Sequence, residues 1–356
     1  MIGRRAGAAA AFAVIAQVGA LPARADVDEA LADLKAGRYL EAVAEIQAVV
    51  DSSPGYAYGH FILGHCLLKM RQHDAAQREF GRALSLDSNR AEYYQGMALA
   101  LNASGNWPLT VRATSEGLTR ARDPRTRYAL LALRGTAWAA LRRWSDAVND
   151  VEAAGRIHAA PWQTAFLGKA RFAMGDYVGA IPPLRQTLQT GPDDPVTLRL
   201  LAECHLRIAT DEGDPVRKRF DYTQAHAYAL RATALAPGDL DVVRLVGRAA
   251  LGAGRLDEAE NIFRHVIAND PRQCYALANL GRTYMAAARW AEAETFLRKA
   301  LACAPRLTTV YESLGDVYLK IGKPQEAAAA FRRAEQLEPT GTAMELPPTV
   351  PVFAPR

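Results

Sequence analysis

The sequence predicts an all-α protein, built as an α-solenoid of about nine helical hairpins, and three observations support this fold class. Hydrophobic residues make up 50% of its 356 residues, alanine is abundant, and no stretch alternates apolar and polar residues as a half-buried strand does. Landmark residues recur every 34 residues in the C-terminal third, a period typical of solenoids. Each recurrence ends at a proline, where a helix must stop.

The first 25 residues differ from the rest and predict a secretory signal peptide. Arg4 and Arg5 precede an apolar stretch, and the small residues of an Ala-Arg-Ala sequence precede a cut before Asp26. An uncleaved anchor is the alternative, because residues 6–23 are just long enough to span a bilayer. We expect an exported, periplasmic protein that does not insert into the membrane after cleavage.

Net charge argues against nucleic acid as a partner. The 43 basic and 38 acidic side chains give a formal charge of +5, and the cut before Asp26 removes three arginines and no acids, which leaves +2. Part of the excess positive charge of the whole chain therefore belongs to the signal segment. A domain that binds nucleic acid would carry a clustered basic patch instead.

Four independent sets of residues carry the 34-residue period. They are Pro237, Pro271, Pro305 and Pro339; Gly247, Gly281 and Gly315; Ala259, Ala293 and Ala327; and Phe263, Leu297 and Phe331. The small residues predict places where two helices approach closely, and the prolines predict the end of the second helix in each unit.

In this register the chain resembles the tetratricopeptide repeat (TPR) family. Leu280-Gly281 with Tyr284, and Leu314-Gly315 with Tyr318, carry the family's Leu-Gly-x-x-Tyr signature. The resemblance implies two antiparallel helices per unit, stacked into a right-handed superhelix. Together with the signal segment, it implies an exported bacterial member that acts as a protein–protein interaction scaffold in the cell envelope.

The register divides the chain into nine units and a tail. The units are 26–56, 57–90, 91–127, 128–160, 161–194, 195–239, 240–273, 274–307 and 308–341. The third unit is degenerate, with Thr110 where alanine is expected. The sixth holds eleven extra residues, which we place near 210–220, between its two helices. Residues 342–356 contain four prolines and predict a disordered tail. This tail is either a spacer or a recognition segment.

Motifs for catalysis, cofactors or metals are missing from the sequence. It contains no G-x-S-x-G, no phosphate-binding glycine loop and no H-E-x-x-H. We therefore expect no enzyme activity, no cofactor and no metal site, and we interpret Cys66 and Cys204 as core residues. Cys274 and Cys303 stand at the two ends of one hairpin, where they form either a disulfide or two separate thiols, depending on the distance between their Cα atoms.

Candidate binding residues follow from the resemblance, which implies that a concave groove is lined by the first helix of each unit. In the middle of the array these are Arg199, Arg244, Arg248, Tyr275, Asn279 and Arg282. In the first half they are Tyr58, Phe61, His65, Gln95, Asn102, Trp162, Lys169 and Phe172. The four arginines would form a basic stripe that binds an anionic peptide or glycan. In the alternative interpretation they pair with nearby acids, namely Glu203, Asp241 and Asp316.

Overall fold

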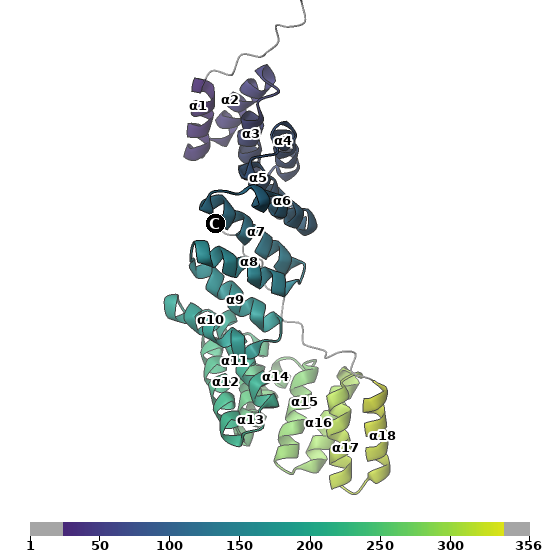
Figure 1. Cartoon of the computed structure of the whole chain (residues 1–356). Helices are drawn as coiled ribbons and strands as arrows, with labels where there is room; N and C mark the ends of the chain where they lie inside the picture. Colours follow the sequence, from purple (N-terminus) through teal and green to yellow (C-terminus); the bar gives the residue numbers. More distant parts are fainter. Residues whose placement is uncertain (1–23, 338–356) are drawn as a thin grey trace, which may run out of the picture. The chain divides into compact units, whose positions relative to one another are not determined.

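The computed structural model describes residues 24–337, which form eighteen α-helices and no strand (Figure 1). The predicted signal peptide lies outside the described residues except for its last two, which begin the first helix. The predicted tail, 342–356, also lies outside them. Within the described chain the helices alternate with short turns, so the predicted all-α solenoid of helical hairpins is confirmed.

The described chain divides into two compact units, residues 24–160 and 161–337. The first unit holds four hairpins: α1 (Arg24–Ala36) with α2 (Tyr39–Ser52), α3 (Ala57–Lys69) with α4 (His73–Leu86), α5 (Ala91–Ala103) with α6 (Trp107–Arg120), and α7 (Pro124–Ala140) with α8 (Trp144–Ile157). Within this unit each helix from α1 to α7 packs on the helix that follows it. The first helices of successive hairpins, α1, α3, α5 and α7, also contact one another.

The second unit holds five hairpins of the same kind: α9 (Pro161–Ala173) with α10 (Tyr177–Thr190), α11 (Pro195–Asp211) with α12 (Pro215–Leu235), α13 (Leu240–Gly252) with α14 (Leu256–Asn269), α15 (Cys274–Ala286) with α16 (Trp290–Cys303), and α17 (Thr308–Lys320) with α18 (Pro324–Gln336). Contacts again run from each helix to the next, and between the first helices α9, α11, α13, α15 and α17.

Close approach of the two helices explains the repeated glycines. A Cβ atom on Gly281 would lie 2.7 Å from Leu297 Cγ, and one on Gly315 would lie 2.4 Å from Phe331 Cε1. Real Cβ atoms do not come this near to other heavy atoms, so glycine lets the bulky residue of the second helix fill the space. The glycine in each first helix is therefore set by packing in spite of its low helix propensity.

The signature tyrosine joins neighbouring hairpins. Tyr284 of α15 is 1% exposed, and its hydroxyl donates to Glu260 Oε1 and accepts from Arg264 Nη2, both at 3.0 Å. The two partners lie on α14, so the buried hydroxyl is satisfied across the boundary between repeats. Stacking therefore adds hydrogen bonds that a single hairpin lacks.

Two boundaries differ from the sequence-based expectation. The eleven extra residues of the sixth unit do not form a loop between its helices. Instead α11 has 17 residues and α12 has 21, whereas α13 and α14 of the next hairpin have 13 and 14. The two helices are thus four and seven residues longer, and only a short turn, 212–214, joins them.

Aspartate–proline pairs explain both differences. The Asp214 side chain accepts a hydrogen bond from Val216 N at 2.8 Å, and Pro215 occupies the first turn, where its missing donor costs nothing. In the same way Asp123 caps α7, so this helix begins at Pro124 and not at the predicted residue 128. The cap extends each helix beyond the 34-residue pattern.

Candidate binding surface

Predicted binding residues of the second unit meet across neighbouring first helices. The guanidinium of Arg244, on α13, lies 5.7 Å from the ring centroid of Tyr275, on α15. Arg282, also on α15, donates to Thr309 O and to Ser313 Oγ of α17, each at 3.5 Å. The structure therefore places these side chains along a surface shared by α13, α15 and α17.

Two of the four arginines are paired with acids of their own helix. Arg199 Nη1 donates to Glu203 Oε1 at 2.8 Å, and Arg244 Nη2 lies 3.4 Å from Asp241 Oδ1. The side chain of Arg244 is only 7% exposed. For these two arginines the alternative interpretation, pairing with Glu203 and Asp241, describes the structure. Asp316 is exposed, and Arg248 is half-buried on α13.

Arg282 differs from them in its surroundings. It is half-buried, and within residues 27–337 no carboxylate lies within ion-pair distance of its guanidinium; its two hydrogen bonds go to neutral oxygens. Burial lowers the pKa of the Arg282 guanidinium, and the negative charge of Glu312 opposes that change. A desolvated cation with long bonds to neutral acceptors gains more from an incoming carboxylate than a solvated one does.

Tyr275 and Asn279 lie on the same helix as Arg282. Tyr275 is 40% exposed, and Asn279 is buried at 8%. Positions 275, 279 and 282 are spaced so that they share one face of α15. We call these three residues, with Thr309 and Ser313, the Arg282 surface.

Aromatic side chains form a cluster on α3 and α5 of the first unit. Phe61 of α3 stacks on Tyr58 at 5.9 Å, meets His65 edge-on at 4.6 Å, and contacts Tyr93 of α5 at 5.0 Å between ring centroids. Burial, with a smaller contribution from Lys69, lowers the pKa of His65 to about 4. This cluster is therefore uncharged at neutral pH. Gln95 and Asn102 are half-buried on α5.

Three further predicted residues lie on α9, and two of them belong to the interior. Phe172 is 7% exposed and packs edge-on against Tyr177 at 5.5 Å. Lys169 is 8% exposed, and burial lowers its pKa. Trp162 is half-buried and contacts Phe166 edge-on at 6.2 Å. Phe172 therefore contributes to the core and is not available as a groove contact.

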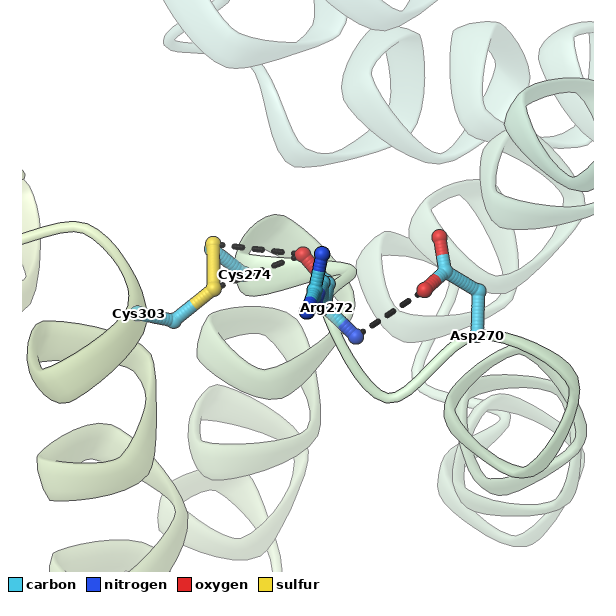
Figure 2. Close-up of a disulfide and its surroundings, with 4 residues drawn as sticks. All are labelled: Asp270, Arg272, Cys274 and Cys303. Carbon is cyan, nitrogen blue, oxygen red and sulfur yellow. Dashed lines mark hydrogen bonds between the residues drawn. A yellow bond between two sulfur atoms is a disulfide. The ribbon is translucent and has the colours of Figure 1, made fainter.

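Cys274 and Cys303 form a disulfide between the start of α15 and the end of α16 (Figure 2). Their Cα atoms are 5.5 Å apart, within the usual range for a disulfide. Both sulfur atoms face the carbonyl oxygen of Arg272, at 3.3 and 3.4 Å. The other two cysteines, Cys66 and Cys204, are free and buried. Burial raises the pKa of the Cys66 thiol to about 11, and it also raises the pKa of the Cys204 thiol.

Buried histidines paired with carboxylates are a feature that the sequence did not reveal. They are His60 with Glu79, His205 with Asp221, and His226 with Glu258, each at 2.7 Å. Each pair joins two helices, so its members are too far apart in sequence for a local pattern to find. Within the described chain no group of three or more histidine, cysteine or acidic residues is arranged to hold a metal ion. No described helix is long and apolar enough to cross a membrane.

Comparison with known proteins identifies the repeat. Family models described as tetratricopeptide repeat match residues 33–100 and 250–314, residues 211–273, and residues 308–340. These matches together include more than half of the chain. No curated protein matches it.

Solved structures resemble the chain in part. One is pilF of Pseudomonas aeruginosa, with 18% identity, a TM-score of 0.49, and coverage of 61% of this chain and 93% of the other. Another is MamA, residues 41 to the end, from Desulfovibrio magneticus RS-1, with 17% identity, a TM-score of 0.41, and coverage of 51% and 97%. A third is TTC0263, a thermophilic TPR protein of Thermus thermophilus, with 22% identity, a TM-score of 0.42, and coverage of 51% and 93%. Likenesses of this size carry no argument about function.

Proposed function

Because the chain belongs to the tetratricopeptide repeat family, we propose that it is a non-enzymatic scaffold in the bacterial cell envelope and binds a protein partner on the first helices of its hairpins. The repeat supports a role in protein–protein interaction. The basic and apolar start of the sequence, with small residues before Asp26, supports export to the periplasm, or anchoring there if the segment is not cleaved.

The state of Arg282 is the observation that carries the proposed mode of binding. Its guanidinium is half-buried, donates only to Thr309 O and Ser313 Oγ, and does so at 3.5 Å. A carboxylate of the partner would replace these long bonds to neutral acceptors by shorter, ion-paired ones, worth about 1.5–3 kcal/mol. The exposed ring of Tyr275 would contact the neighbouring part of the ligand.

The small extent of this cationic site favours a peptide over a glycan. An extended acidic glycan would need a row of accessible cations, whereas Arg199 and Arg244 are already paired with Glu203 and Asp241. The half-buried guanidinium of Arg282, on the same helix face as the Tyr275 ring, is suited to one carboxylate with an apolar side chain nearby. We therefore infer that the partner presents a short segment that contains an acidic residue.

Anisotropy titrations with two labelled probes test this mode of binding. The probes are a glutamate- and leucine-containing peptide and an acidic oligogalacturonate. Arg282→Met should weaken peptide binding by about 10-fold or more, as expected for loss of a charge-assisted contact. Arg332→Met is the matched control, because Arg332 is an exposed arginine on a second helix, α18. Equal binding by wild type and Arg282→Met, or stronger capture of the oligosaccharide, would contradict the peptide proposal.

Crosslinking in the native cell tests location and partner together. A photo-crosslinking residue in place of Tyr275 should capture an envelope protein, and the same residue at Val178 should not. Val178 is 68% exposed but lies on a second helix, α10. The intact mass of the purified native protein should correspond to a chain that begins at Asp26. Capture of cytoplasmic proteins only, with a full-length mass, would refute the envelope role.

A further inference from the structure

The outer face of α12 is apolar and exposed over its whole length. α12 has 21 residues, and its Val216, Phe220 and Leu230 side chains are 78%, 59% and 47% exposed. The opposite face holds the buried residues of the helix, including Ala225 and Ala229, and packs on α11 and α13. By contrast, the next second helix, α14, exposes mainly polar side chains: Asn261, Arg264, His265 and Asn269.

The exposed residues of this face have the spacing of a coiled-coil seam. Six exposed residues, which we call the α12 seam, lie along this face: Val216, Phe220, Thr223, Ala227, Leu230 and Ala234. Successive residues of the seam are alternately four and three positions apart, which is the a/d pattern of a heptad repeat. Five of the six are apolar. A seam with this spacing is suited to another helix, because side chains at a and d pack between four residues of a facing helix.

We propose that the helix that covers this seam is α12 of a second copy of the chain, packed antiparallel around a two-fold axis that passes between Thr223 and Ala227. This arrangement sets Val216 against Ala234, Phe220 against Leu230, and Thr223 against Ala227 of the second copy. The layers that contain Val216 and Thr223 each place a larger side chain against alanine, and the middle layer places Phe220 against Leu230. Each layer occurs twice, as an isologous interface requires.

The charges at the two ends of α12 favour the antiparallel orientation. Arg217, Lys218 and Arg219 lie near its N-terminus, and a parallel pair would bring them against their own copies. In the antiparallel pair they approach the C-terminal end of the second helix, whose partial charge is negative. Arg231 at that end is already neutralised by Asp193 at 2.6 Å.

The same charges make an anionic membrane a poorer occupant. The end of α11 carries Asp211, and the turn before α12 carries Glu212 and Asp214. These three acids offset the three cations that follow, so this end of the hairpin lacks the excess positive charge that attracts anionic lipid. A second copy of α12 covers the apolar seam, and its binding does not require excess positive charge.

The area of the seam limits the expected strength of the dimer. A helix of this length is roughly 30 Å long, so one seam covers less than the ~800 Å² per partner of a standard interface. We therefore expect a dimer with a dissociation constant in the micromolar range. The seam contains no residue of the Arg282 surface, so both copies keep that surface, and a partner with two acidic segments would gain avidity.

Sedimentation velocity over a concentration series tests the dimer on the chain that begins at Asp26. Wild type should change from monomer to dimer, whereas Phe220→Glu and Leu230→Glu should remain monomeric, with the dissociation constant raised at least about 10-fold. Both residues are exposed, so circular dichroism should show unchanged helix content. Val178→Glu is the matched control and should dimerise like wild type. A monomeric wild type, or a Phe220→Glu variant that still dimerises, would overturn the proposal.

Cysteine crosslinking then fixes the orientation. A mixture of Val216→Cys and Ala234→Cys chains should form a heterodimeric disulfide under mild oxidation, and neither variant should crosslink efficiently by itself. Efficient crosslinking of Val216→Cys alone would show a parallel pair and refute the antiparallel arrangement. Flotation of a monomeric wild type with phosphatidylglycerol vesicles, lost in Phe220→Glu, would instead assign the seam to lipid.

Discussion

Replacement of Cys274 and Cys303 by serine should loosen one hairpin of the second unit and leave distant repeats unchanged. The disulfide ties the start of α15 to the end of α16 across 29 residues of sequence, with Cα atoms 5.5 Å apart. The other end of this hairpin is closed by the turn between its helices. At the open end of the hairpin, only side-chain packing would hold the two helices together without the disulfide.

The size of the effect follows from the length of the closed loop. For a loop of about 30 residues, the chain-entropy model predicts stabilisation of about 3.5 kcal/mol, mostly through restriction of the unfolded segment. In a repeat protein each unit contacts chiefly its neighbours, so local opening free energies differ along the chain. We expect the loss to be concentrated in α15 and α16 and to extend weakly into α14 and α17.

Hydrogen exchange followed by mass spectrometry measures this distribution directly. Protection of amides in α15 and α16 should fall by up to roughly several hundred-fold in the double serine variant, and addition of a reductant to wild type should have the same effect. Amides of α3 and α4, in the other unit, serve as the internal control. Unchanged protection after reduction, or an equal loss across all repeats, would refute this reasoning.

Three further predictions concern packing, backbone and pH. Gly315→Ala should destabilise the last hairpin by about 1–3 kcal/mol in urea unfolding, because the new methyl group meets the Phe331 ring. Gly213→Ala is the control and should have little effect, because the space around Gly213 is open. Ala288→Gly should raise stability by about 0.5–1 kcal/mol, because Ala288 has φ of 55° in the turn between α15 and α16; an unchanged melting temperature would contradict this. The folded chain holds the pKa of His65 at about 4, below its usual value of 6.5, so the unfolded chain binds more protons between these values. Stability of the first unit should therefore fall by up to about 2 kcal/mol from pH 7 to pH 5, and His65→Leu should remove that dependence.

Much of the fold could be predicted because the repeat constrains sequence locally. Gly281, Leu297 and Tyr284 recur at fixed spacing since each hairpin solves the same packing problem, so the period alone indicates paired helices that touch at small residues. The conformation of the extra residues in the sixth unit was not predicted. The 34-residue register gives their number, but it does not show that they lengthen α11 and α12, where the Asp214-Pro215 pair starts the second helix.

The candidate site shows the limit of the same reasoning. Positions on first helices identify residues that face one surface, but they do not say which cations are already neutralised. Arg199 and Arg282 both lie on the predicted groove face of a first helix, yet Arg199 is paired with Glu203 and Arg282 donates only to neutral oxygens. Tyr93 joins the aromatic cluster of α3 from a buried position, which no groove pattern predicts.

By itself, therefore, the sequence determined the helical hairpin, its period and the face that each first helix presents, since these depend on neighbours three, four or 34 residues away. Only the tertiary structure decided how charges are paired, where buried histidines meet carboxylates, and that the lengthened α12 exposes an apolar seam. Those features depend on which side chains of different helices reach one another, and on what is left uncovered after the hairpins have packed.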